Sequence, residues 1–424
     1  MLTAITGVNW GDEGKGRMVD LLSERQDIVV RYQGGNNAGH TVVNEKGAFI
    51  LNLLPSGILR EEVVNVMGPG MAVDIEHLCG ELDRLREAGI RITPERLKIS
   101  GRAIICMPWH KQQDRLEEDR LGDAKFGSTQ RGISPVYGDK YMKKALRLGD
   151  LLEPHYLRER LQTVLPWKNL TLTGIYGARA LSFEETLGWL QKYGRPLLPY
   201  LCDTGVYLEE AIKKDKRILF EAQLGALRDI DYGIYPYTSS SNTLSGYAPI
   251  GAGIPGRRLD ESIGVMKAYS TCVGEGPFTC EWFGEEAQAL RQAGAEYGAA
   301  TGRPRRVGPF DVPASRYGVR LQGAHALALT KLDVLSYLDE IPVCTAYEVE
   351  GRLTREFPVG AGLRSAKPVY KKLRGWKKDV SGCRRWEQLP LEAQQYIRFL
   401  EEQTGAPVRY VSVGAHREAY IRLD

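Results

Sequence analysis

A glycine-rich segment with a single lysine is the first part of the chain where chemistry can be expected. It runs from Gly7 to Gly16 and reads GVNWGDEGKG. Its backbone amides and the N-terminus of a following helix can face a phosphate, while Lys15 can neutralise the oxygens of a transferred group. The alternative is a glycine-rich turn that binds no ligand, because short motifs of this kind also occur by chance.

This segment departs from the standard phosphate loop, G-x-x-x-x-G-K-[ST], in two ways. Six residues separate Gly7 from Gly14, and Gly16 stands where Ser or Thr normally ligates the metal ion. A metal ion at this loop must therefore find another oxygen ligand, and Asp12 is the candidate.

A second polar loop, Gln33–Thr41, reads QGGNNAGHT and follows a second apolar stretch. Ligands of open α/β sheets lie beyond the carboxyl ends of the strands, so we expect this loop beside the first. Asn37 offers amide contacts, and His40 can donate to a phosphoryl oxygen. A lone histidine is more often structural, but its position among glycines, rather than on an apolar face, favours a functional role for His40.

The segment Thr330–Asp333 reads TKLD after an apolar stretch, which is how many GTPases recognise guanine. The Asp333 carboxylate can accept hydrogen bonds from N1–H and the 2-amino group of guanine, and adenine has neither donor. The Lys331 stem can pack on the ring. The motif is short enough to occur by chance, and its position at a strand end strengthens the interpretation.

Arginines gather in a loop of glycine and proline at Thr301–Arg306, which reads TGRPRR. Guanidinium groups match carboxylates and phosphates in a bidentate manner. The alternatives are a solvated basic loop or a nucleic-acid patch, and the lack of interleaved aromatic residues disfavours the latter. We interpret the other basic run, Lys367–Lys378, as a solvated face.

Short apolar runs that alternate with amphipathic stretches must position these loops. They predict an α/β fold with a large, mostly parallel central sheet flanked by helices, a P-loop-NTPase-like phosphate loop, and elaborated helical and loop insertions. Asp74 can cap a helix that carries an apolar stripe. We expect a single domain over residues 1–424 with a mostly helical insertion at about 110–215. The predicted strands are 2–6, 27–32, 63–67, 217–221, 263–269, 326–330, 342–347 and 408–413, with a helix over 14–24.

The composition excludes several classes of protein. The 424 residues are 43% hydrophobic and 26% charged, as in ordinary globular proteins, and the net charge is only +4. We therefore expect neither nucleic-acid binding nor a membrane anchor. The start of the chain has no signal-peptide pattern, no apolar run is long enough to span a membrane, and the seven cysteines include no CxxC pair. We expect a cytoplasmic protein with reduced thiols, without a disulfide framework or a zinc site.

Taken together, the loops resemble those of the adenylosuccinate synthetase family, and the similarity runs essentially from end to end. The segments that carry it are WGDEGKGR (10–17), RYQGGNNAGHTVV (31–43), LNLLPSGIL (51–59), DIDYGIYPYTSSSNT (229–243), KAYSTCVGEGPF (267–278), TGRPRRVGPFD (301–311) and TKLDVL (330–335). The resemblance implies a ligase that makes adenylosuccinate, GDP and phosphate from IMP, L-aspartate and GTP, the first committed step of AMP synthesis from IMP. It also implies Mg²⁺, a cytoplasmic location and a homodimer.

The resemblance further implies roles for individual residues. Asp12 would act as general base on N1 of IMP, His40 as general acid on the transferring phosphoryl group, and Lys15 as a third catalytic residue, with Mg²⁺ held by Asp12 and the Gly39 carbonyl. GTP would contact Gly11, Asp12, Glu13, Gly14, Lys15, Gly16, Arg17, Gly39, His40, Thr41, Arg305, Lys331, Leu332, Asp333, Ser412, Val413 and Gly414. IMP would contact Asp12, Glu13, Gly14, Lys15, Asn37, Ala38, Gly39, His40, Thr129, Gln223, Leu224, Ser239 and Arg303, with Lys143 supplied by the partner subunit. Aspartate would contact Ala299, Ala300, Thr301, Gly302, Arg303 and Arg305.

The chain departs from the family pattern mainly around the substrate pocket. The family's EGAQG reads EAQLG, so the amide expected near O6 of IMP is either Gln223, shifted by one, or absent, with Leu224 in its place. Further departures are Gln130 for a glycine, Lys143 for the partner-subunit arginine, Ser239 and Ala300 for threonines, and GAHR at 414–417 for a GPDR-like segment.

Two alternatives remain open at this point. Leu224, Lys143 and Ala300 suggest a paralogous ligase that uses another purine nucleotide, such as (d)GMP, or another amine donor. A GTP-binding switch is a different class of protein. Asp12, His40 and the arginine loop argue against it, because a switch does not need a second anion clamp.

Overall fold

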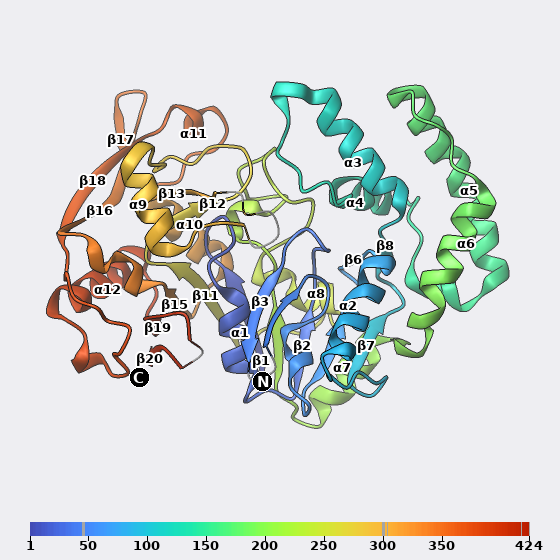
Figure 1. The fold of residues 1–424 in the computed structure, drawn as a ribbon, viewed down its shortest axis with the longest axis horizontal. Helices are drawn as coiled ribbons and strands as arrows, with labels where there is room; N and C mark the ends of the chain where they lie inside the picture. Colours follow the sequence, from blue (N-terminus) through green and yellow to red (C-terminus); the bar gives the residue numbers. More distant parts are fainter. Residues whose placement is uncertain (45–46, 299–301, 303, 417, 424) are drawn as a thin grey trace.

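The computed structural model describes residues 1–44, 47–298, 302, 304–416 and 418–423, and its centre is a ten-stranded sheet (Figure 1). Neighbouring strands are parallel except for the pair β19–β20 at one edge. The predicted large, mostly parallel sheet is thus confirmed. In sheet order the strands are β20 (Tyr420–Arg422), β19 (Val408–Ser412), β15 (Ala326–Thr330), β11 (Glu261–Lys267), β1 (Leu2–Gly7), β10 (Ile218–Glu221), β2 (Ile28–Arg31), β5 (Val64–Met67), β7 (Leu97–Ser100) and β9 (Leu201–Cys202).

Helices cover both faces of this sheet, which explains why its central strands β1, β10 and β2 are buried throughout and largely apolar. Along β1, Ile5 packs on one face with Met18 and Val19 of α1, whereas Ala4 packs on the other with Leu208 of α7. This alternation follows from the two-residue period of a strand. The helices are α1 (Lys15–Ser23), α2 (Ile75–Glu87), α3 (Pro108–Leu121), α4 (Ile133–Tyr141), α5 (Pro154–Leu170), α6 (Phe183–Gly194), α7 (Thr204–Lys213), α8 (Ala248–Ala252), α9 (Gly284–Gly294), α10 (Val312–Gln322), α11 (Ala361–Ser365) and α12 (Leu391–Thr404).

Smaller units lie around the central sheet. Helices α5 and α6 stand at one end of the molecule, and the sheet formed by β14, β16, β17 and β18 lies at the other (Figure 1). The additional strands are β3 (His40–Asn44), β4 (Gly47–Leu51), β6 (Ala72–Val73), β8 (Ile104–Ile105), β12 (Ser270–Cys272), β13 (Arg306–Gly308), β14 (Phe310–Asp311), β16 (Glu340–Val349), β17 (Arg352–Thr354) and β18 (Lys367–Arg374). Short helical turns are η1 (Ser56–Leu59), η2 (Gly122–Ala124), η3 (Leu148–Leu152), η4 (Thr171–Ile175), η5 (Arg195–Tyr200), η6 (Ala226–Arg228), η7 (Ser245–Tyr247), η8 (Leu332–Tyr337) and η9 (Trp386–Gln388).

Several local expectations can be compared with these elements. The Asp74 carboxylate accepts a hydrogen bond from the His77 amide at 3.2 Å, so the predicted cap of α2 is confirmed. All seven cysteines are free thiols. Cys280, Asp311 and Cys344 do gather within 4.8 Å, but Asp311 caps α10 and accepts hydrogen bonds from Cys280 and the Tyr347 hydroxyl. Within the described part of the chain, no helix is long and apolar enough to cross a membrane.

Candidate active site

The phosphate loop connects the end of β1 to the start of α1. Its backbone takes positive φ at Gly11, Asp12 and Gly14, with values of 103°, 59° and 94°. Glycine accepts this conformation freely, whereas an aspartate adopts it at a cost. The Asp12 side chain remains 38% exposed, so its carboxylate is available to a ligand and to solvent.

The charged pair Glu13–Lys15 lies beneath this loop. Lys15 Nζ is 2.7 Å from Glu13 Oε2, and both side chains are buried. Glu13 Oε1 accepts the backbone amides of Asn9 at 3.1 Å and Gly11 at 2.9 Å. The Glu13 carboxylate therefore shapes the loop from inside, and Lys15 is the only cation bonded to it in the described structure.

His40 lies directly against the phosphate loop. A Cβ added to Gly16 would come within 2.8 Å of the His40 Cβ, so only glycine permits this approach. This contact gives a physical reason for the glycine that replaces the usual Ser or Thr of a phosphate loop. The two loops that follow β1 and β2 therefore lie side by side, with β10 between their strands.

Glu221, at the end of β10, holds His40 in place. Its Oε1 contacts His40 Nδ1, and the carboxylate also accepts the amide and hydroxyl of Ser56, at 2.8 and 2.7 Å. Arg31 Nη1 lies 3.6 Å away. Although burial opposes ionisation of Glu221, the hydrogen bond from His40 and the charge of Arg31 outweigh it and lower the pKa of Glu221 to about 2.

The protonation of His40 follows from this pairing. Because an ionised carboxylate only accepts hydrogen bonds, His40 Nδ1 carries a proton. Burial lowers the pKa of His40, although Glu221 partly opposes the shift, so the free imidazole is favoured in its neutral form. A neutral ring protonated at Nδ1 has no proton at Nε2. His40 can therefore donate from Nε2 only after it takes up a second proton, which a bound anion would favour.

The predicted guanine-binding residues lie on the other side of the phosphate loop. Thr330 Oγ1, at the end of β15, donates to the Glu13 carbonyl at 2.6 Å and so ties the two segments together. Lys331 follows with φ of 60°. Asp333 Oδ1 is buried and has no hydrogen-bond partner among the described residues, as expected for an atom that awaits a ligand.

Arg17 connects α1 to the C-terminal segment at this end of the site. Its guanidinium donates to Ser412 Oγ at 2.7 Å, to the Gly414 carbonyl and to the Ala419 carbonyl at 3.1 Å. The predicted residues Ser412 and Gly414 thus contact the first turn of α1 although they are distant in sequence.

A cavity of about 550 Å³ opens on the opposite side of the phosphate loop. Helix α3 holds one wall: Asp114 accepts from the Ser128 hydroxyl at 2.7 Å, and Glu118 accepts the Gly127 and Ser128 amides, both at 3.0 Å. Of the residues predicted to bind IMP, the lining includes Asn37, Thr129, Leu224 and Ser239.

Gln223 and Leu224 have different surroundings, which bears on the alternatives that the sequence left open. The Gln223 amide is buried and bonded to the backbone of Gly35, at 2.7 and 3.2 Å, and to the Asn52 carbonyl at 2.9 Å. Leu224, with φ of 61°, lines the cavity instead. Leu224 therefore faces the cavity, whereas the Gln223 amide is engaged by the backbone.

Arg305 joins the arginine loop to the phosphate loop. Its Nε lies 3.1 Å from Asp12 Oδ2, and its Nη1 lies 2.7 Å from Glu296 Oε2. Gly302 is exposed with φ of 65°. Ala299, Ala300, Thr301, Arg303 and Arg417 lie outside the described residues.

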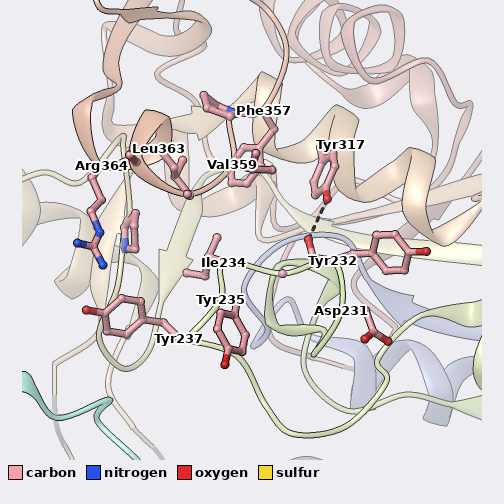
Figure 2. A pocket seen from close by; sticks show the side chains of 15 residues that line it. Asp231, Tyr232, Ile234, Tyr235, Tyr237, Tyr317, Phe357, Val359, Leu363 and Arg364 are labelled. Atoms are coloured by element: carbon pink, nitrogen blue, oxygen red, sulfur yellow. Dashed lines mark hydrogen bonds between the residues drawn. The ribbon is translucent and has the colours of Figure 1, made fainter. Parts of the chain in front are cut away.

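A second cavity, of about 520 Å³, is lined by residues of the segment 231–237 and of the segment 357–364 (Figure 2). Aromatic side chains form part of its walls, and the Tyr317 hydroxyl donates to the Tyr232 carbonyl at 2.8 Å. Tyr235 and Tyr237 line both cavities. None of the site residues predicted from the sequence lines the second cavity, whereas four of them line the first.

Comparison with known proteins identifies the fold and the loops. The family model for adenylosuccinate synthetase matches residues 4–421. The chain belongs to the adenylosuccinate synthetase family. An adenylosuccinate synthetase of Carboxydothermus hydrogenoformans is 45% identical over 99% of this chain and 98% of its own length, and one of Caldanaerobacter subterraneus is 43% identical over 100% and 99%. The solved structure of a fully ligated adenylosuccinate synthetase from Plasmodium falciparum superposes with a TM-score of 0.93 at 34% identity and covers 100% of both chains.

Membership in the adenylosuccinate synthetase family makes the chain a GTP-binding ligase of AMP biosynthesis. The alternatives of a paralogous ligase and of a GTP-binding switch are not favoured. A cyanophage succinoaminodeoxyadenylate synthetase, solved with dGMP and dATP, has a TM-score of 0.61 at 16% identity and covers 99% of this chain and 94% of its own. At that identity it shares the fold alone.

Sequence reasoning missed the residues that hold the predicted ones. Glu221 lies in the segment EAQLG, but its pairing with His40 joins positions 181 residues apart and no local spacing reveals it. Glu296 precedes the arginine loop without forming part of a motif. The pairing of a buried carboxylate with a predicted cation or imidazole can be identified only when the three-dimensional positions of the strands are known.

Proposed function

We propose that this chain joins L-aspartate to C6 of IMP in two steps. In the first, Asp12 takes the proton from N1 of IMP, and O6 attacks the γ-phosphorus of GTP, so that the bond to the β-phosphate oxygen breaks and GDP leaves. In the second, the aspartate amine attacks C6, and the C6–O6 bond breaks with release of phosphate. Phosphorylation thus converts a poor oxide leaving group into a good one.

One observation carries this proposal: the phosphate loop lies between the two sets of predicted nucleotide residues. On one side it bonds to Thr330 at the guanine end, at 2.6 Å. On the other, a Cβ added to Gly11 would lie 3.3 Å from the Leu224 Cα at the cavity wall. A γ-phosphoryl group over this loop would therefore lie between guanine and the purine of IMP, as an in-line transfer requires.

We assign His40 and Lys15 to the transferring phosphoryl group. His40, held by Glu221, would take up a proton with the anion and donate from Nε2 as charge moves onto the phosphoryl oxygens. Lys15 is paired with Glu13 at 2.7 Å, and its positive charge would lie close to the phosphate oxygens of GTP. The backbone of Gly11–Arg17, together with Gly39 and Thr41, would supply the remaining GTP contacts.

Asp12 and the Gly39 carbonyl would hold Mg²⁺. A carboxylate and a carbonyl are the oxygen ligands that this ion prefers, and the 38% exposure of Asp12 leaves room for the waters that Mg²⁺ retains. When bound, the ion would neutralise phosphate oxygens of GTP. At the base, Asp333 would accept from guanine, with Lys331, Leu332 and Ser412–Gly414 around the ring.

In the cavity, IMP would contact Asn37, Ala38, Thr129, Leu224 and Ser239, with Gln223 behind them. We further propose a homodimer in which Lys143 of the partner subunit reaches the IMP phosphate. The exposed neighbours Tyr141 and Met142, 71% and 52% exposed, support an interface at this corner. Arg305, with residues 299–303, would bind the carboxylates of aspartate.

A three-substrate assay tests this function. Adenylosuccinate formation is followed by absorbance with IMP, GTP, L-aspartate and Mg²⁺ present, and each component is omitted in turn. We expect product only when all four are present. Product from GMP or dGMP at a higher kcat/KM than from IMP, or GTP hydrolysis that ignores IMP and aspartate, would contradict the assignment.

A further inference from the structure

A fully buried carboxylate, Glu296, lies between the two ends of the GTP site. It follows helix α9 and lies a few residues before the arginine loop. The segments on the two sides of that loop are paired next to Glu296. The Arg305 amide donates to the Glu296 carbonyl at 3.0 Å, and Tyr297 pairs with Pro304 in an antiparallel bridge.

The side chain of Glu296 binds cations from separate elements with its two oxygens. Oε1 accepts from Lys267 Nζ at 2.8 Å, from Lys331 Nζ at 3.1 Å and from the Tyr269 hydroxyl at 2.5 Å. Oε2 accepts from Arg305 Nη1 at 2.7 Å. The same carboxylate thus contacts the lysine that follows the guanine strand and the arginine that lies 3.1 Å from Asp12.

The charges make this arrangement dependent on one ionised carboxylate. Burial opposes ionisation of Glu296, but Lys267 and Lys331 outweigh it and lower the pKa of Glu296. Burial lowers the pKa of Lys267 to about 8, although Glu296 opposes that shift. An uncompensated charge in this position would be costly, so the positions of Lys331 and Arg305 are both set by Glu296.

We propose that Glu296 is a positioning residue that couples guanine recognition at Lys331 to the reacting end of the site at Arg305 and Asp12. The proposal rests on the function proposed above. It means that the position of Lys331 at the guanine end and the position of Arg305 at the aspartate end depend on each other through the two oxygens of one carboxylate.

The chemistry of the side chain gives the coupling its sharpest test. Glu296→Gln removes the negative charge that both Lys331 and Arg305 face, and it also replaces one of the two acceptor oxygens with an NH₂ donor. We therefore expect effects at both ends: the preference for GTP over ITP, which lacks the 2-amino group, and the KM for aspartate should each change about tenfold or more. The KM for IMP should change less than about twofold, because its cavity is separate.

Two further variants test whether effects at both ends are specific to Glu296. Asp333→Asn should lower the preference for GTP without changing the KM for aspartate, since Asp333 has no bond to Arg305. Glu281→Gln is the matched control, because Glu281 pairs with the neighbouring Arg306 at 2.5 Å and touches neither Lys331 nor Asp12. It should leave both quantities unchanged. A Glu296→Gln effect confined to one end, or absent from both, would overturn the coupling.

Further measurements keep the proposal testable if Glu296→Gln does not fold. Lys331→Met should then raise the KM for aspartate, and Arg305→Lys should lower the preference for GTP over ITP, each reporting at the opposite end. Unchanged values in both would overturn the proposal. Dissociation constants for GTP and ITP, measured by calorimetry on the full chain without turnover, separate the coupling from the proposed function. If the wild-type chain makes no adenylosuccinate, the function fails, while the binding preference still tests Glu296.

Discussion

At the scale of single residues, the site contains non-glycine residues whose backbone has a positive φ, outside the commonly occupied regions. Asp12, Leu224 and Lys331 have φ of 59°, 61° and 60°, and none is glycine. Such conformations cost about 1–3 kcal/mol each and persist only where packing determines them, typically at functional sites. Here they lie at the phosphate loop, at the cavity wall and at the guanine end, which are the three parts that the reaction must bring together.

Asp12→Asn should abolish turnover while largely sparing nucleotide binding. The amide keeps the size of the side chain but cannot accept the proton from N1, so we expect kcat to fall by about 10²–10⁴-fold. GTP and IMP affinities, measured by calorimetry without Mg²⁺, should change only a few-fold. A variant with near-normal kcat would remove Asp12 from the role of base.

Glu221→Gln should lower kcat and change the acid stability of the protein. The pKa of Glu221 falls from 4.5 to about 2 on folding, so its ionised form favours the folded state. That contribution is present above pH 4.5 and is lost as the pH falls toward 2. The free energy of unfolding of the variant, from denaturant titrations across this window, should therefore depend less on pH than that of the wild type.

Glu81→Gln provides the matched control for Glu221. Glu81 is also a buried carboxylate, but burial raises its pKa, despite hydrogen bonds from the Leu53 and Leu54 amides. Its ionised form therefore disfavours folding, and its replacement should change the pH dependence of stability in the opposite direction. Equal shifts in both variants would contradict the pairing of Glu221 with His40 as the cause.

At the scale of elements, the sequence predicts the central strands well and the edges poorly. The predictions for 2–6, 27–32, 217–221 and 326–330 are confirmed as β1, β2, β10 and β15, because strands buried on both faces are largely apolar. Strands β7, β9 and β20, toward the two ends of the sheet, were missed, and they have only four, two and three residues. The strand predicted at 342–347 exists within β16 but belongs to the separate sheet, a pairing that no local pattern specifies.

Gly16→Ala tests the packing of α1 against the loop that carries His40. The added methyl group would come within 2.8 Å of the His40 Cβ, so one of the two loops must move. A displacement of this kind can reduce kcat by about 100-fold. We expect the loss in kcat with a folded protein by circular dichroism. Gly188→Ala in α6 is the control, because its Cβ would meet no atom within 4 Å, and it should retain full activity.

At the scale of the whole molecule, the parallel sheet explains why distant segments form one site. The carboxyl ends of β1, β2, β10 and β15 lie along one edge, so loops separated by up to hundreds of residues meet there. That rule placed the loop of His40 beside the loop of Asp12 from sequence. It could not reveal Glu221 or Glu296, whose partners depend on side-chain packing across strands. We propose that residues 1–424 form a single domain, with α3–α7 as its helical insertion.

Lys143→Ala tests the proposed dimer. If Lys143 reaches the IMP phosphate of the other subunit, its loss should raise the KM for IMP about tenfold and leave the KM for GTP unchanged. A mixture of Lys143→Ala and Asp12→Asn chains should regain activity. A mixed dimer has one site that combines an intact Asp12 from one subunit with an intact Lys143 from the other. Sedimentation equilibrium gives the oligomeric state. A monomer with normal KM for IMP, or mixing without recovery, would contradict the shared site.

The most direct test of the reaction follows one oxygen atom. IMP labelled with ¹⁸O at O6 is incubated with the wild-type chain, GTP, L-aspartate and Mg²⁺, and the released phosphate is analysed by mass spectrometry. Attack of O6 on the γ-phosphoryl group, held between Asp12 and His40, predicts one ¹⁸O in each phosphate and none in adenylosuccinate at C6. Unlabelled phosphate formed together with adenylosuccinate would contradict the transfer.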